Sequence, residues 1–209
     1  MLDPQLAKMR LQRLADNVFA LSLILLISNV ELPAISSEPS ASEINALLMA
    51  NLPEMGVYLL TFAVIAANWV KHVELFSVMK HVDRSLMMQQ LWLLAFLMLI
   101  PVTNQFINVD DSQTLILVVY SLNLLAVGVM LWLGWRRLAN HPELRIEGLD
   151  IDKLQARSKD TLSEPLVAAL SIVAALHSSL AWELTFVLIP ILFSKRHHLE
   201  PLKKRLSKQ

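Results

Sequence analysis

Long apolar runs with few charges are the feature that most constrains this chain. A helix that crosses a bilayer needs about 20 mostly apolar residues. Four such runs cover about residues 14–30, 54–75, 85–102 and 113–135, and a fifth covers 166–193. Charged residues make up only 17 % of the chain, against about a quarter in soluble domains. We therefore predict an all-α integral membrane protein that forms a single membrane domain over residues 1–209.

The fifth run decides the number of spans. Its 28 residues are too many for one straight helix and few for two full spans. The polar sequence His177-Ser178-Ser179 interrupts it near the middle. We predict two short helices, about residues 165–176 and 180–193, that form a hairpin and bring the total to six spans. One long tilted helix, and hence five spans, is the alternative.

The distribution of Lys and Arg favours six spans. With six, all 18 lie on one side: before the first span, between the second and third, between the fourth and fifth, and in the tail. Lys and Arg accumulate in cytoplasmic loops. Both termini are therefore predicted to be cytoplasmic, with a cytoplasmic linker at 138–163 and a basic tail at 195–209. Five spans would place the tail charges outside.

Two connecting segments carry local signals. Ser42 is placed to cap a short amphipathic helix over residues 43–52, and Pro53 suits the first turn of a separate helix that follows. The linker 138–163 is polar and of mixed charge, which predicts a surface segment with one helical turn.

The first span is unusually polar for a membrane helix. At 100° per residue, Asn17, Leu21, Ile24 and Ser28 share one stripe, with Leu25 beside it. Repeated around the axis of an oligomer, this stripe gives a hydrophobic neck between two wettable ends, and hydrophobic constrictions gate ions by dewetting. The alternative is that the apolar members only pack or face lipid.

A cluster of polar side chains is predicted at the inner end of this span. Asp16 is expected to pair with Arg10 or Arg13, or with Trp69 and His72 of the second span. His72 would then make conduction pH-dependent, because histidine titrates near pH ~6.5. The alternatives are a solvated Asp16, an aromatic-belt Trp69 and a plain interfacial His72.

The sequence gives little support for an enzyme. It contains no cysteine, which excludes disulfides and thiolate chemistry. His177 with Ser178 lacks the strand-turn-helix setting of a nucleophile, and His197-His198 lies in a basic tail that suits lipid headgroups. No cofactor and no nucleic-acid partner are expected.

Two blocks resemble a known family. The run from Arg10 to Asp16 and on to Leu21, and the block Trp69-Val-Lys-His72, are similar to signatures of the prokaryotic relatives of transmembrane protein 175, a lysosomal and endosomal potassium channel. The resemblance implies a six-span homotetramer whose first helices line the pore, with Leu21 as the narrowest ring and no carbonyl filter. It also implies the Arg10, Asp16, Trp69 and His72 network.

The chain departs from the family pattern at two places. Leu14-Ala15 replaces Phe-Ser before Asp16, and Ile24 stands where many members have threonine. The resemblance thus favours the pore more than its potassium selectivity.

The leading hypothesis is a potassium-permeable cation channel in the plasma membrane of a prokaryote, with K+ ions and the lipid bilayer as its other partners. A small proton-coupled transporter or proton-leak protein that uses Asp16 and His72 is the alternative. A membrane enzyme or assembly factor ranks third.

Overall fold

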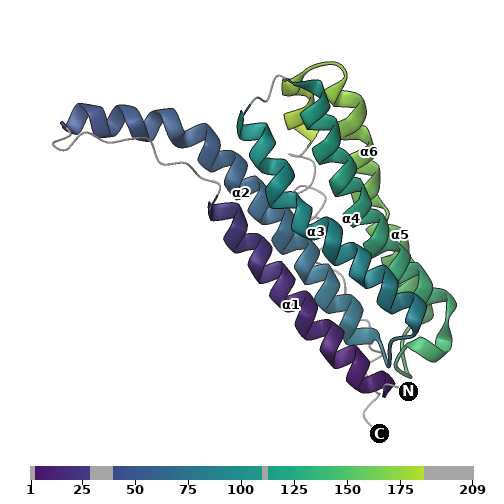
Figure 1. The fold of residues 1–209 in the computed structure, drawn as a ribbon. Helices are drawn as coiled ribbons and strands as arrows, with labels where there is room; N and C mark the ends of the chain where they lie inside the picture. The colour runs from purple at the N-terminus through teal and green to yellow at the C-terminus, as the bar shows by residue number, and fades with distance from the viewer. Residues whose placement is uncertain (1–2, 29–39, 110–112, 186–209) are drawn as a thin grey trace, which may run out of the picture.

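Four long helices packed side by side form the body of the protein (Figure 1). The structure, a computed structural model, describes residues 3–28, 40–109 and 113–185. The helices are α1 (Pro4–Ser28), α2 (Ala41–Val78), α3 (Arg84–Val109) and α4 (Thr114–Asn140). Each is long and apolar enough to cross a membrane, α2 over Met55–Val78 and α3 over Arg84–Ile107. The all-helical membrane class is therefore confirmed.

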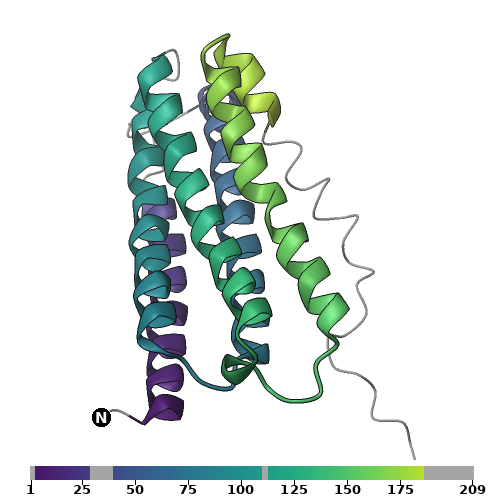
Figure 2. The ribbon, with the colours of Figure 1, turned by 90° about the vertical axis from the view of Figure 1, so that its right-hand side faces the viewer.

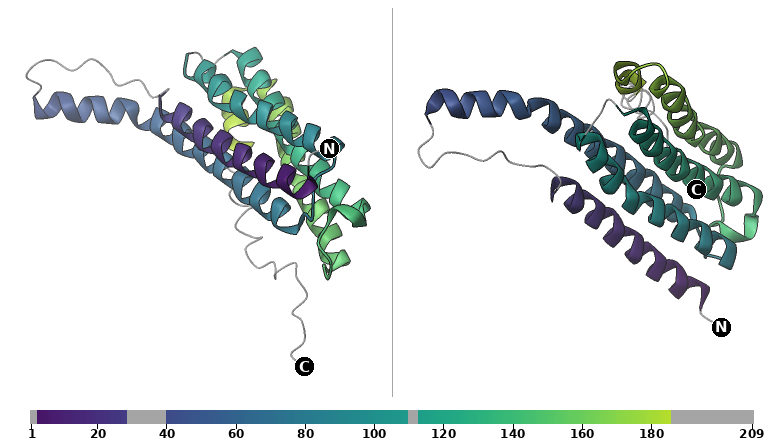
Figure 3. Two further views of the ribbon diagram at one scale, coloured as in Figure 1. Left: turned by 60° about the horizontal axis from the view of Figure 1, so that its bottom comes forward. Right: turned by 45° about the horizontal axis from the view of Figure 1, so that its top comes forward.

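The helices form layers with α1 on one side (Figure 3). α1 packs against α2 and α3, and α4 packs on α3 in the centre. On the far side of α4 lie α5 (Ile151–Thr161) and α6 (Ser163–Ala175), which follow one another nearly in line (Figure 2). Since α1 is covered from only one side, much of its surface has no partner within the protomer.

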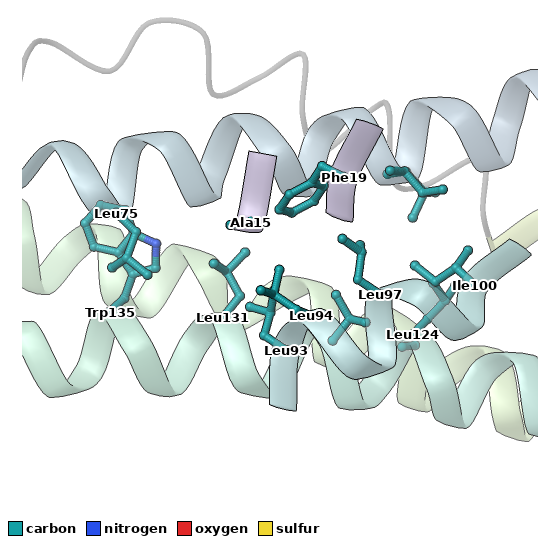
Figure 4. Packing of buried hydrophobic residues seen from close by; sticks show 14 of the residues in the cluster. Ala15, Phe19, Leu75, Leu93, Leu94, Leu97, Ile100, Leu124, Leu131 and Trp135 are labelled. Atoms are coloured by element: carbon teal, nitrogen blue, oxygen red, sulfur yellow. The ribbon is translucent and has the colours of Figure 1, made fainter. Parts of the chain in front are cut away.

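The core is filled by large apolar side chains from all four long helices (Figure 4). Trp135, Phe19 and Phe76 are the bulkiest side chains among those that are completely buried. Gly128 allows close contact between α4 and α6, because a Cβ atom there would lie 3.0 Å from Pro165 Cδ. The filled core leaves the described part of one protomer without an obvious central route for ions.

α2 is one helix of 38 residues, not two. The prediction of a separate helix over 43–52 that ends before Pro53 was wrong, and so was Ser42 as its cap. Ser40 is the cap, and its side chain accepts a hydrogen bond from the Glu43 backbone N–H at 3.2 Å. The first turns of α2 leave the bundle as an arm (Figures 1 and 3). Proline removes one hydrogen bond and strains one turn, and an apolar helix continues through it.

The other long helices also extend beyond the predicted spans. α1 begins ten residues before residue 14, and α3 continues past Pro101 to Val109. The extra turns of α3 are held by Asn104, which accepts a hydrogen bond from Thr61 of α2 at 2.9 Å. Hydropathy marks the apolar part of a helix, whereas contacts such as this one decide where the helix ends.

The end of the chain begins as the predicted hairpin. α6 stops at Ala175, a turn follows, and residues 179–185 are helical again. Trp182 anchors this segment, because its indole Nε1 donates to Ser121 Oγ of α4 at 2.9 Å. The rest of the predicted sixth span and the basic tail lie outside the described residues.

The linker between α4 and α6 is more ordered than predicted. It contains a short 3-10 helix, η1 (Pro142–Leu144), and the 11-residue helix α5 in place of one helical turn. Leu144 and Leu154 are buried in the core. Backbone hydrogen bonds from Lys80 N to Leu144 O and from Ile146 N to Val78 O tie the linker to the end of α2. A few apolar residues at the right spacing are enough to dock a mostly polar segment.

Asp83 links the start of α3 to the end of α4. Its carboxylate accepts hydrogen bonds from the Leu86 backbone N–H at 2.8 Å and from the Arg137 guanidinium. Burial opposes its ionisation, but the hydrogen bonds from Arg137 and Leu86 outweigh burial and lower the pKa of Asp83 below its ordinary value.

We expect Asp83→Asn to lower the melting temperature of the purified protein at neutral pH. A depressed carboxyl pKa stabilises the fold above the unfolded-state pKa of about 3.9, and this stabilisation is lost as the pH falls through the folded-state pKa. The difference from wild type should therefore shrink as the pH approaches 4 and below in thermal melts. An equal difference at all pH values would contradict the ionic role of Asp83.

Candidate functional site

α1 has a buried face and an exposed face, as expected for a helix covered from one side. Its buried residues recur every three or four positions and are Ala7, Leu11, Ala15, Phe19, Ser22 and Leu26. Residues at this spacing lie on one side of a helix. The Ser22 hydroxyl donates a hydrogen bond to Val18 O within α1 at 2.9 Å. The buried face of α1 therefore needs no hydrogen-bond partner for Ser22 on a neighbouring helix.

The predicted pore stripe lies on the exposed face. Leu21, Ile24 and Leu25 are 42 %, 60 % and 38 % exposed. Asn17 and Ser28, at the two ends of the stripe, are exposed as well. Ser28 Oγ donates to Ile24 O at 3.1 Å, within the same helix. The protomer thus presents a polar-apolar-apolar-polar surface that no other described part of the chain covers.

Asp16, which was predicted at the inner end of the first span, lies at the middle of the longer helix α1 and is joined there to Trp69. The indole Nε1 of Trp69 donates to Asp16 Oδ1 at 3.2 Å and links α1 to α2. Arg10 and Arg13 are exposed, and within the described part of the chain neither forms an ion pair with Asp16. Of the partners that the sequence offered Asp16, the structure brings Trp69 to it by a hydrogen bond.

His72 is buried between two aromatic rings. Only 1 % of its surface is exposed. Its ring lies 5.4 Å from that of Phe19 on α1 and stacks at 4.4 Å on that of Phe76, one turn further along α2. His72 is therefore part of the α1–α2 packing and not an interfacial residue, which is a correction to that alternative.

Two ion pairs near the end of α2 are missing from the sequence prediction. Lys71 pairs with Glu164 at the start of α6, and Glu74 pairs with Arg157 of α5. Lys71 is only 8 % exposed. Charged residues inside an apolar segment are expensive and usually paired. Lys71 and Glu74 therefore did signal pairing, although not the identity of their partners.

Lys8 makes a further polar contact with the end of α2, which is a hydrogen bond and not an ion pair. Its ammonium donates to the backbone carbonyl of Met79, at the end of α2, at 2.6 Å. Both this hydrogen bond and the one between Asp16 and Trp69 are made by the N-terminal half of α1. In the described residues, no group of three or more His, Asp and Glu side chains is placed to hold a metal ion.

Comparison with known proteins identifies relatives of this chain. The family model described as endosomal/lysosomal potassium channel TMEM175 matches residues 10–101. A potassium channel of Streptomyces collinus is 26 % identical over 174 residues, which cover 79 % of this chain and 83 % of that protein. The endosomal/lysosomal proton channel TMEM175 of Danio rerio is 22 % identical over 84 % of this chain, but the match covers only 33 % of the fish protein. The predicted resemblance is confirmed.

Solved structures agree with the fold. The crystal structure of a lysosomal potassium-selective channel TMEM175 homolog from Chamaesiphon minutus matches with a TM-score of 0.77 at 20 % identity, over 91 % of this chain and 98 % of that one. A variant of the potassium channel MtTMEM175 matches with a TM-score of 0.63 at 17 % identity, over 89 % and 90 % of the two chains.

Proposed function

We propose that this chain, a relative of the TMEM175 channels through residues 10–101, forms a potassium-permeable cation channel whose pore is lined by the α1 helices of several copies. The observation that carries the proposal is the exposed stripe on α1. Its five residues share one face and have no cover within the described protomer. The Streptomyces relative, a potassium channel, covers most of this chain.

The pore lies between protomers in this proposal. The core of one protomer is packed with leucines and aromatic rings, which leaves no path for a hydrated ion. A ring of four α1 helices, as in a homotetramer, would bring four copies of the stripe to a common axis. Leu21 then forms the narrowest ring, with Ile24 next to it.

In this arrangement selectivity would not come from backbone carbonyls. α1 is helical from Pro4 to Ser28, so its carbonyl groups before the last turn are used by helix hydrogen bonds. The neck between Asn17 and Ser28 would be controlled by the hydration of apolar side chains. The channel would accordingly be permeable to K+ with modest selectivity.

Charge supports one orientation in the plasma membrane. The Lys and Arg residues of the described chain gather where α1 begins and α4 ends (Figure 1). By the positive-inside rule this end faces the cytoplasm, which places the N-terminus there. A basic tail that returns through a final span would place the C-terminus on the same side.

Flux and cross-linking together test the proposal. The full-length protein in liposomes should show K+ flux above that of empty liposomes, with Na+ flux lower but measurable. Cross-linking in mild detergent should end at a tetramer band. A particle that stays monomeric, or liposomes without cation flux, would overturn it.

Proton permeation is a second candidate function. It is favoured by Asp16 on the exposed side of α1 and by a fish relative that is a proton channel. Asp16→Asn should then abolish pH-driven dye changes in liposomes while K+ flux remains. If the main proposal is correct, both the pH-driven dye change and the K+ flux should instead respond to substitutions at Leu21.

A further inference from the structure

Several buried side chains in the described residues have polar atoms without a protein partner, and three of these side chains are at most 1 % exposed. They are His72 at Nε2, Gln90 at both amide atoms and Trp135 at the indole Nε1. Their exposed fractions are 1 %, 0 % and 0 %. They come from α2, α3 and α4, and they lie on the buried side of α1.

These side chains belong to one place in the bundle. The Gln90 amide lies beside the His72 imidazole and acts on it as a weak hydrogen-bond partner, although no hydrogen bond of normal geometry joins the two side chains. On α4, a Cβ atom added to Gly134 would lie 3.1 Å from Gln90 Nε2 and 2.9 Å from Leu75 Cδ2. Trp135 follows Gly134 directly, and Figure 4 shows it beside Leu75 of α2. Because Gly134 has no side chain, Leu75 and Gln90 pack directly against this turn of α4.

Leaving these atoms unpaired would be costly. Each buried donor or acceptor without a hydrogen bond costs about 1–3 kcal/mol. The aromatic rings of Phe19 and Phe76 on either side of His72 offer no strong acceptor. Folded proteins resolve such cases with internal water, which makes about three hydrogen bonds to buried polar groups.

The available donors and acceptors suit water and not an ion. The Gln90 amide nitrogen and the Trp135 indole donate, the Gln90 oxygen accepts, and the His72 nitrogen can do either. A water molecule accepts two hydrogen bonds and donates two, so it can serve all of these atoms. None of these three side chains is a carboxylate, and the lack of a negative ligand disfavours a bare cation. The donors of the three side chains are neutral, so they do not balance the charge of an anion.

We infer that each protomer binds at least one internal water molecule between His72, Gln90 and Trp135, where Gln90 packs against Gly134. This site lies behind α1, on its buried face, and is separate from the exposed stripe of Leu21. The water allows His72 to stay inside an apolar packing layer, and it joins the inner ends of α2, α3 and α4 by hydrogen bonds.

Water-edited solid-state NMR on the complete oligomer in lipid bilayers tests this inference. The side-chain N–H signal of Trp135 should receive magnetisation from water several-fold faster than that of Trp182. Trp182 is the matched control, because it is also buried at 7 % exposure but donates to Ser121 Oγ at 2.9 Å. The His72 ring nitrogen should be as fast as Trp135. Transfer to Trp135 and His72 that is as slow as to Trp182 would overturn the inference.

A pair of neighbouring glutamines gives the second measurement. Gln90→Met removes both amide atoms at similar volume and should slow the transfer from water to His72 to the rate of Trp182. Gln89→Met is the control, because the Gln89 amide is already bonded to Met130 O at 2.8 Å. It should leave the His72 signal at the wild-type rate. Unchanged transfer to His72 in Gln90→Met would contradict the proposed site.

Discussion

Leu21→Ser is expected to raise K+ flux several-fold in liposomes. In the proposed assembly Leu21 forms the apolar ring between the polar residues Asn17 and Ser28, and an apolar neck blocks ions because water leaves it. A hydroxyl at this ring keeps water in the neck, so the barrier to ions falls. Leu21→Ala should have a smaller effect in the same direction, since it widens the ring without adding a polar group. A K+-sensitive dye inside the liposomes measures the flux.

Ile27→Ser is the matched control for Leu21→Ser. Ile27 is also an exposed apolar residue of α1, at 56 % exposure. It lies about 120° from Leu21 around the helix and so off the stripe. Its replacement should leave flux close to wild type. Equal flux changes in the two variants, or no change in Leu21→Ser, would argue that the stripe faces lipid.

Lys71→Met is expected to cause a large loss of stability. Lys71 and Glu164 Oε1 form an ion pair whose side chains are only 10 % and 17 % exposed, and the second carboxylate oxygen of Glu164, Oε2, accepts no hydrogen bond from the described residues. Removing one member of a buried pair leaves an uncompensated charge and costs about 3–5 kcal/mol. Thermal melting in detergent, followed by tryptophan fluorescence, should show a marked drop in the transition temperature.

Two further variants separate the buried charge from the loss of lysine itself. The double variant Lys71→Met with Glu164→Met should recover much of the stability, because no isolated charge remains. Lys80→Met is the surface control: Lys80 pairs with Glu147 at 3.7 Å, with side chains 53 % and 94 % exposed. Exposed pairs contribute about 0–1 kcal/mol. If Lys71→Met and Lys80→Met had the same transition temperature, the ion pair between Lys71 and Glu164 would not contribute to stability.

Local periodicity predicted the faces of α1 well. The stripe from Asn17 to Ser28 depends only on helix geometry, and the structure exposes all five of its members. The Asp16–Trp69 contact was among the predicted partners because both residues stand at the same end of adjacent spans. What each face meets in an assembly is a property of several chains, so the constriction stays a prediction.

Long-range contacts set the limits of prediction elsewhere. Lys71 and Glu164 are far apart in the sequence. They meet because the chain returns after α4 and brings the start of α6 to α2. His72 looked interfacial because it follows Trp69 and Lys71 in a polar cluster, yet the helix turns it inward onto Phe76. The arm of α2 was mispredicted because Pro53 was given more weight than the continuous helical pattern on both sides of it.

The polar contacts of α1 are unevenly placed along its length, and this has a mechanical consequence. In the described residues, Lys8 and Asp16 supply the side-chain hydrogen bonds that tie α1 to α2. Beyond Phe19, the contacts of α1 with other described residues are apolar packing, which has little directional preference. By contrast, ion pairs pin α2 to α5 and α6. α1 is therefore held mainly at its N-terminal half, so that a small tilt about this half moves Ser28 further than Ile24, and Ile24 further than Leu21.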